Sequence, residues 1–451
     1  MGNKCRPKKV KAPYRKYVAG QGHSRTYGFT PTTSPAVEEI YGEECITEFA
    51  RDNDVEGIDK VQEHCSNRKS TDSIVHFKAR QNESMGSLDP FRKTSDEEKE
   101  NLGDMRLPWE IQALILKFSD EPFDPSYLLV CKVWYLLCLP LIYRHPALNC
   151  RNFNSFVDAV ISNRKKKIGG YVEELNLASI MQSGRNSFVS RLLRRCSPSL
   201  QKFTAPQTSF GYAPLISLKS CLQLKYLDLG LVSETVKLEQ LFAAIKNFKH
   251  LTHLAFPRSS INCDGFREFQ WPENLQYLKL SGGITNEFVR ETQWPRSITT
   301  LEFSYCPKVD EHAVYRVLSQ IGDNLQHLYF HYPMPSLHEN ALDYVFRYSS
   351  RLISIQLMVD YCSRWVFSEH MLASLVYPRP LRTIYLECSG SLGLASKIHP
   401  DDFTIAIMES RLPCLKNISV SSKLGWDMNS DDVSDLVSVF EDQGGSLYLS
   451  Y

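Results

Sequence analysis

Hydrophobic positions follow two patterns along the chain, and the first is a short apolar block between residues 107 and 143. Near its start, Pro108 suits the first turn of a helix, and Glu110 places an acid where the helix dipole favours negative charge. The apolar residues that follow recur at i, i+3, i+4 and i+7: Ile111, Leu114, Ile115 and Phe118. This spacing predicts an amphipathic helix that begins near residue 108.

A second helix is predicted a few residues later in the same block. Asp124 is placed to cap it, and Pro125 falls in its first turn. From Tyr127 through Leu139 the helix is apolar on nearly every side, with Lys132 as its one charge. Such a helix must be covered on more than one side, and a unit this small has too little interior to cover it. We therefore expect the cover to come from the rest of the chain or from a partner protein.

The second pattern is a repeat that begins near residue 172. The motif Leu-x-x-Leu-x-Leu, with conservative substitutes, starts at ten positions: Val172, Leu200, Leu224, Leu251, Leu275, Ile298, Leu325, Leu352, Leu381 and Leu415. An eleventh, degenerate copy ends in Leu447-x-Leu449. A period in the twenties with this strand motif is typical of a leucine-rich repeat.

Amphipathic helices are predicted between the strands of the repeat. Their apolar stripes are Phe188, Leu192 and Leu193; Leu238, Leu241, Phe242, Ile245 and Phe248; Val314, Val317, Leu318 and Ile321; Leu342, Val345 and Phe346; and Val433, Leu436, Val437 and Phe440. Each copy thus reads strand then helix, and neither element can bury its apolar side alone. We predict an α/β leucine-rich-repeat solenoid of about ten to eleven strand–helix repeats.

The residues that alternate with the strand leucines point to the opposite face, which would be the concave surface of the solenoid. The candidate substrate-binding residues there are Tyr226, His253, Tyr277, Lys279, His327, Tyr329 and Tyr385. We expect the tyrosines and His327 to hold equivalent positions around one shared hollow. Aromatic side chains with a polar tip are common interface anchors, and the inward leucines should hold each repeat together without the tyrosine hydroxyls.

A structural role for these aromatic residues stays open as well, because tyrosine has a high strand propensity and any solvent-facing strand position tolerates it. The outward strand positions include no arginine. A receptor for phosphorylated segments would gather arginine there, so phosphate-led recognition is disfavoured.

Composition narrows the classes of function. The 451 residues carry 52 basic and 51 acidic side chains, so the net charge of +1 does not favour nucleic acid as a partner. The 13 cysteines form no Cys-x-x-Cys pair, which indicates reduced thiols in an intracellular compartment, and Cys131, Cys138 and Cys196 should act as small hydrophobes. We expect no metal, no cofactor and no signal peptide. The apolar run over 127–143, interrupted by Pro140, is shorter than the about 20 residues of a membrane span.

Residues 1–104 are polar and lack apolar periodicity, which predicts a largely disordered tail, with a short helix considered over 36–50. The first 37 residues are basic and contain no acid. Three interpretations stay open: a solvated tail, a targeting or membrane-surface element, and a myristoyl anchor at Gly2. Pro7 and Pro13 would break a presequence helix, and Arg6 departs from the myristoylation pattern. Membrane association is expected only through this tail.

A basic run from Arg164 to Lys167 suits a solvated loop before the first repeat strand, and a nuclear localisation signal is the other interpretation. The chain contains no Gly-x-x-x-x-Gly-Lys phosphate loop, no Gly-x-Ser-x-Gly elbow and no His-Glu-x-x-His pair. We therefore do not expect it to be an enzyme.

The apolar block resembles an F-box. The resemblance rests on Leu107-Pro108-Trp109-Glu110-Ile111, followed by Leu129-Val130-Cys131-Lys132-Val133-Trp134 and closing on Pro140-Leu141-Ile142-Tyr143. It implies a three-helix module over 105–150 that docks on the Skp adaptor of cullin-based ubiquitin ligases. The adaptor-binding residues would be Leu107, Pro108, Ile111, Leu114, Ile115, Leu129, Val130 and Trp134.

Residues 151–451 would then form the leucine-rich-repeat domain. The copy from Ile298 to Ile321, in which Leu301 and Phe303 precede Cys306, resembles the cysteine-containing repeat subtype of many F-box proteins. Other copies replace the cysteine by Thr208, Ser259 and Asp360.

The resemblance implies a substrate-recruiting subunit of a Skp-cullin-F-box ubiquitin ligase, in the cytoplasm, the nucleus or both. Its F-box would reach the cullin scaffold through Skp, and its solenoid would hold an unknown protein substrate. The rival hypothesis is a Skp-binding tether without ligase function, at the mitochondrial surface through its basic tail. The residues alone do not separate the two, because Skp makes most of the cullin contact.

Overall fold

The computed structural model describes residues 107–119, 124–162, 167–180, 186–261 and 265–450. Contacts between Cα atoms separate a unit over Glu100–Tyr451 from Met1–Lys99, and the described residues all belong to the former. The predictions for the tail over 1–104, for a helix over 36–50 and for most of the basic run at 164–166 lie outside the described residues.

The F-box-like block forms two α-helices joined by a 3-10 turn. They are α1 (Trp109–Lys117), η3 (Pro125–Leu129) and α2 (Lys132–Arg144). Pro108 occupies the position before α1 and makes no side-chain capping bond, so it lies just outside the predicted first turn. Asp124 caps η3 by accepting a 2.8 Å hydrogen bond from the Ser126 amide. The predicted continuous helix from residue 125 is wrong, because Cys131 adopts an extended backbone and ends the first segment. The Cys131 sulfur then caps α2, so this thiol is an exposed cap and not a buried hydrophobe.

A third helix, α3 (Phe153–Ile161), stands between the block and the first repeat strand. It buries the side chains of Phe153, Phe156, Val157 and Val160. The turn η4 (Ile168–Tyr171) follows and leads into the sheet. α3 thereby covers the apolar end of the repeat array that no preceding repeat covers.

Eleven parallel strands form one sheet whose order follows the chain. They are β1 (Glu174–Asn176), β2 (Lys202–Thr204), β3 (Tyr226–Asp228), β5 (His253–Ala255), β7 (Tyr277–Ser281), β8 (Thr300–Ser304), β9 (His327–His331), β10 (Ser354–Met358), β11 (Thr383–Glu387), β12 (Asn417–Ser421) and β13 (Ser446–Ser450). Each predicted copy of the leucine motif supplies one strand, including the degenerate eleventh copy. The predicted repeat number and strand positions are therefore confirmed.

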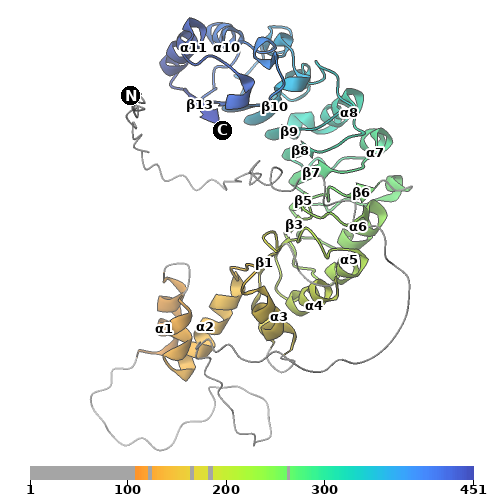
Figure 1. Ribbon diagram of the computed structural model, residues 1–451, viewed down its shortest axis with the longest axis vertical. Coiled ribbons are helices and arrows are strands. Elements are labelled where there is room, and N and C mark those ends of the chain that lie inside the picture. The colour runs from red at the N-terminus through yellow and green to blue at the C-terminus, as the bar shows by residue number, and fades with distance from the viewer. Residues whose placement is uncertain (1–106, 120–123, 163–166, 181–185, 262–264, 451) are drawn as a thin grey trace, which may run out of the picture. The chain divides into compact units, whose positions relative to one another are not determined.

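Helices line the outer side of the repeat array and strands line its inner side (Figure 1). The helices are α4 (Asn186–Cys196), α5 (Tyr212–Leu218), α6 (Leu238–Ile245), α7 (Asn286–Glu291), α8 (Glu311–Ile321), α9 (Val345–Tyr348), α10 (Pro400–Met408) and α11 (Asp431–Asp442). The remaining short elements are β4 (Val236–Lys237) paired with β6 (Ser260–Ile261), and the turns η5 (Phe266–Glu268), η6 (Gly322–Asn324), η7 (Val359–Tyr361), η8 (Arg364–Phe367), η9 (Leu394–Ser396) and η10 (Ser422–Leu424).

Two repeats depart from the strand-then-helix prediction. Among the described residues, only η5 stands between β5 and β7 apart from β6, and only η7 and η8 stand between β10 and β11. The preceding helix α9 is a single turn, shorter than the predicted stripe from Leu342. Only the inward apolar residues are needed to close a repeat, so short turns can replace a helix.

The core lies between the sheet and the outer helices. Strand leucines such as Leu278, Leu301 and Leu328 are fully buried, and the predicted helical stripes are buried apart from half-buried Phe188 and Val437. One continuous cluster of buried side chains runs from α3 to α11. Among the described residues, no helix is both long and apolar enough to cross a membrane.

Candidate functional site

The first candidate surface is the outside of the α1–η3–α2 module. Its apolar side chains are turned to solvent: Leu114 is 48% exposed, Ile115 52%, Leu129 87% and Val130 59%. In α1 only Leu116 is buried, and in α2 only Cys138. The predicted α1 stripe therefore exists but faces away from the rest of the described chain. An apolar surface of this kind on a soluble protein is typical of a protein-interaction site.

Seven of the eight predicted adaptor-binding residues are exposed, and Trp134 is the exception. Its indole Nε1 donates a 2.8 Å hydrogen bond to Gln112 Oε1 in α1. Its ring also meets Tyr127 edge-on at 5.7 Å between centroids. Trp134 thus holds α1, η3 and α2 together, and only part of its ring is available to a partner.

The end of α2 is joined directly to the first repeat. Arg144 forms a 3.0 Å ion pair with Glu173, and the Glu173 amide donates to the Arg144 carbonyl. The ring of Tyr143 stacks on Phe156 of α3 at 6.2 Å. These contacts connect the apolar module to the repeat array through packed side chains and not only through the backbone.

The second candidate surface is the inner face of the sheet. The strand register places the predicted residues in two parallel rows, so the prediction of equivalent positions is only partly right. Tyr226, His253, Tyr277 and His327 occupy the first row. Lys279, Tyr329 and Tyr385 occupy the second row, two residues further along their strands.

Three aromatic rings of the first row lie in contact: Tyr226 is tilted against His253, and His253 stacks on Tyr277. The rings of Tyr226 and His253 lie 5.6 Å apart between centroids, and those of His253 and Tyr277 lie 5.5 Å apart. Burial lowers the pKa of His253 and of His327. Both imidazoles are therefore biased towards the neutral form.

Glu302 on β8 is the centre of a polar network on this face. Its carboxylate accepts a hydrogen bond from the Tyr277 hydroxyl, lies 2.6 Å from Lys279 Nζ and lies 3.0 Å from His331 Nε2. Only 7% of Glu302 is exposed. Burial by itself would raise the pKa of this carboxyl, but the hydrogen bond to His331 and the charge of Lys279 lower it to about 2. The Tyr277 hydroxyl therefore takes part in a network of the inner face; that a repeat folds without it stays a prediction.

A smaller network follows on the neighbouring strands. Ser354 Oγ lies 2.6 Å from His327 Nδ1 and 2.9 Å from the Tyr329 hydroxyl. Tyr385, in contrast, is 36% exposed, and Tyr448 on β13 is 53% exposed. Sequence reasoning missed Tyr448, although the register puts it in the second row beside Ser419. Extending the strand alignment into the degenerate eleventh copy would have found it.

The site residues do not form a metal or nucleophile centre. Among the described residues, no three His, Cys, Asp or Glu side chains are grouped so that they could hold a metal ion. Burial raises the pKa of Cys221 and of Cys306 to about 12, which keeps these thiols protonated. What the two surfaces offer is apolar contact at one and aromatic and polar contact at the other, which is the chemistry of protein recognition.

Comparison with known proteins agrees with this arrangement. No protein-family profile matches the chain. It is 58% identical to F-box protein YDR306C of Saccharomyces cerevisiae over an alignment of 480 positions that covers all of both chains. It is 32% identical to Protein pof5 of Schizosaccharomyces pombe over 335 residues, which cover 74% of this chain and 94% of that protein.

The solved structures with a similar backbone path have little sequence identity to this chain. The leucine-rich repeat-containing protein LegL7 from Legionella pneumophila is 11% identical, with a TM-score of 0.37 over 65% of this chain and 89% of its own. A chain of the yeast Rad7 and Elc1 complex is also 11% identical, with a TM-score of 0.34 over 62% of this chain and 87% of its own.

The module at 107–144 carries the F-box-like motif on an exposed apolar surface, and it is followed by an eleven-stranded leucine-rich-repeat sheet. Both features point to a protein-interaction adaptor. Given a relative of that name that is 58% identical over its full length, the chain belongs to the F-box protein family.

Proposed function

We propose that this protein is the substrate-recognition subunit of a Skp-cullin-F-box ubiquitin ligase. One observation carries the proposal: an exposed apolar surface stands in a chain whose ten full copies of the leucine motif are buried. It is formed by the F-box-like motif residues Leu107, Ile111, Leu114, Ile115, Leu129 and Val130. Covering that surface would remove apolar area from water at roughly 25 cal/mol per Å². The Skp adaptor of the family is the partner that such a surface would bind.

The inner face of the sheet would hold the substrate. It brings aromatic side chains from several strands onto one surface, and Tyr385 and Tyr448 at its C-terminal end are free of the Glu302 network. Tyrosine anchors of this kind dominate the binding energy of many interfaces. The protein would contribute no chemistry of its own, since holding a substrate near a ubiquitin-charged enzyme on the same scaffold raises the effective concentration of the reacting groups.

The test is reconstitution of the full chain with purified Skp adaptor and cullin scaffold, followed by size-exclusion chromatography. The wild-type chain should co-elute with the adaptor and bring the cullin. Replacing Leu114 and Ile115 by aspartate should weaken adaptor binding by about 100-fold or more, because two charges would be buried against apolar surface. Unchanged co-elution of this variant would contradict the proposed docking surface.

The matched control is Leu222→Asp, because Leu222 is 50% exposed but lies in the repeat array. It should leave adaptor binding unchanged. A wild-type chain that binds the adaptor but never brings the cullin would contradict the ligase role and favour the non-ligase tether.

A further inference from the structure

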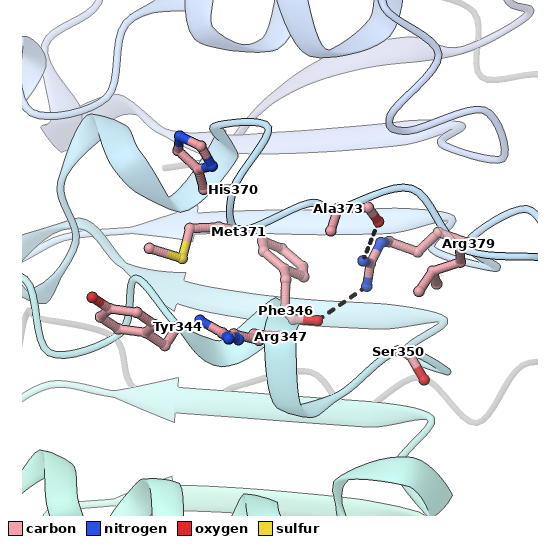
Figure 2. Close-up of a pocket in the computed structure, with 9 residues that line it drawn as sticks. Tyr344, Phe346, Arg347, Ser350, His370, Met371, Ala373 and Arg379 are labelled. Atoms are coloured by element: carbon pink, nitrogen blue, oxygen red, sulfur yellow. Dashed lines mark hydrogen bonds between the residues drawn. The ribbon is translucent and has the colours of Figure 1, made fainter.

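The outer side of the array has a hollow where two repeats meet. Between β10 and β11 the described chain contains no α-helix, and the segment after η8 runs irregularly to β11. A hollow of about 510 Å³ lies between this segment and α9 (Figure 2). Its lining includes Phe346 and Arg347 of α9 and His370, Met371 and Arg379 of the irregular segment. It lies on the helix side, so it belongs to neither surface described above.

A buried arginine forms one wall of this hollow. Arg379 is only 5% exposed, and its guanidinium donates hydrogen bonds to the carbonyls of Phe346 (Nη1, 3.2 Å) and Ala373 (Nη2, 3.4 Å). Figure 2 shows both bonds, with the guanidinium held between the two backbone segments. The guanidinium carbon also lies 5.9 Å from the centre of the Phe346 ring, a cation–π contact. The carbonyls and the ring are all neutral groups, so they provide no negative charge to balance that of Arg379. Buried charges in proteins are ordinarily paired.

No carboxylate compensates this charge within the part of the chain that the structure describes. Arg379 forms no ion pair there, whereas Arg290 pairs with Asp310 and Arg364 with Asp402. Burial is the cause that lowers the pKa of the Arg379 guanidinium. An arginine stays protonated in proteins even so.

The other arginine of the lining, Arg347, has the same sign as Arg379. Arg347 is exposed and forms no ion pair among the described residues, and His370 stacks on Trp365 at 6.4 Å between ring centroids. None of the lining residues is acidic. The hollow is therefore electrostatically complementary to an anion.

Solvent-exposed apolar side chains lie at the hollow. Leu375 is 43% exposed, Val376 93% and Tyr377 80%, all on the same irregular segment. Successive exposed apolar residues of this kind are unusual on a soluble surface unless a partner covers them. An anion that binds here would therefore have apolar groups attached to it.

We propose that this hollow is a second protein-binding site, which takes the carboxylate of an Asp or Glu side chain from a partner segment with apolar residues next to it. A carboxylate fits better than a phosphate, because the Arg379 nitrogens already donate to two carbonyls and only Arg347 is free to form a two-pronged contact. The inference does not depend on adaptor docking or on the inner face of the sheet.

The experiment is a selection of short random peptides on the full chain, followed by fluorescence anisotropy with the synthetic peptides. Enriched peptides should combine Asp or Glu with aromatic or aliphatic residues. Their affinity should fall about tenfold or more in Arg347→Glu, and equally when the acid in the peptide is changed to its amide. Arg351→Glu is the matched control, since Arg351 is exposed but does not line the hollow, and it should bind like the wild type.

Arg379→Met tests the buried charge and should weaken binding too, with the melting temperature as a check on folding. If that variant does not fold, binding by Arg347→Glu and binding of the amide peptide still test the proposed carboxylate site. Enrichment of peptides without acids, or binding that Arg347→Glu leaves unchanged, would overturn the proposal. So would tighter binding of a phosphoserine version of the peptide, or Arg347-dependent binding to vesicles that contain phosphatidylserine in place of the peptide.

Discussion

The α1–η3–α2 module and the inner face of the sheet are both exposed, but their side chains differ. The exposed apolar side chains of the module are not covered by the described chain, whereas the polar side chains of the inner face largely satisfy one another. The module presents Leu114, Ile115, Leu129 and Val130 to solvent with nothing in the described chain to cover them. On the inner face, Glu302 satisfies Tyr277, Lys279 and His331 within the chain. One surface lacks a partner, and the other is largely complete without one.

The difference shows what each surface requires. Covering exposed apolar groups lowers the free energy, so a partner protein on the module surface would stabilise it. Polar groups that already hydrogen-bond to one another lose little free energy when no partner is bound, and these bonds hold the tyrosines in fixed positions. A pre-formed surface loses less conformational entropy on binding, which suits a receptor that binds and releases substrates.

The largest effect on stability is expected when a leucine is replaced by alanine in the buried core and not in the exposed module. Leu278→Ala, in the fully buried core beneath the inner face, should lower the free energy of unfolding by about 2–5 kcal/mol. Leu114→Ala, at an exposed module position, should change it by about 0.5 kcal/mol or less. Urea denaturation of the isolated chain measures both, and a large loss at Leu114 would mean that the module face is covered from within.

The next effect concerns the network itself. Glu302→Gln keeps the shape of the side chain but removes the charge that Lys279 and His331 contact, so it should destabilise the fold by about 1–3 kcal/mol. Glu174→Gln is the matched control, because Glu174 is more exposed than Glu302 and lies 3.5 Å from both Lys202 and His145. This substitution should cost about 0.5 kcal/mol or less. Equal effects in urea denaturation would show that the network does not stabilise the inner face.

The difference in stability between the wild type and Glu302→Gln should depend on pH. The folded state lowers the pKa of Glu302 from 4.5 to about 2, so its contribution to stability is complete above pH 4.5 and is lost as the pH falls towards 2. The stability gap between wild type and Glu302→Gln should therefore shrink across this window. A gap that stays constant from pH 6 to pH 3 would argue against an ionised, paired Glu302.

The smallest effect on stability is expected at the exposed end of the inner face. Tyr385→Ala should change the free energy of unfolding by about 0.5 kcal/mol or less, yet it should reduce the set of co-purified proteins other than the adaptor. Tyr277→Ala should differ, because it removes a bond to Glu302 and a stacked ring as well. Mass spectrometry of both purifications decides, and an unchanged protein set for Tyr385→Ala would place substrate binding elsewhere.

The repeat architecture could be predicted from sequence because it depends on local periodicity. Every strand of the sheet falls on a copy of the leucine motif, since the inward leucines must recur at one position per repeat. The break at Cys131 could not be predicted in the same way. It depends on one residue in an extended conformation inside a run that is apolar on both sides of it.

The networks were harder to foresee because they join residues of different repeats. Lys279 and Glu302 are 23 positions apart in the sequence but are direct neighbours in the strand register. Aligning the motif copies would reveal that opposite charges meet there. The lack of an ion pair at Arg379 among the described residues leaves no such trace, because it arises beside the β10–β11 connection, which contains no α-helix.

Hydrogen–deuterium exchange of the full chain, with and without purified Skp adaptor, tests most directly whether the adaptor covers the module. The inner face of the sheet, which is largely complete by itself, should not respond. The adaptor should slow exchange in the amides of 109–117 and 125–144 and leave those of β7–β9 unchanged. No slowing in the module, or slowing confined to the repeat strands, would contradict the account.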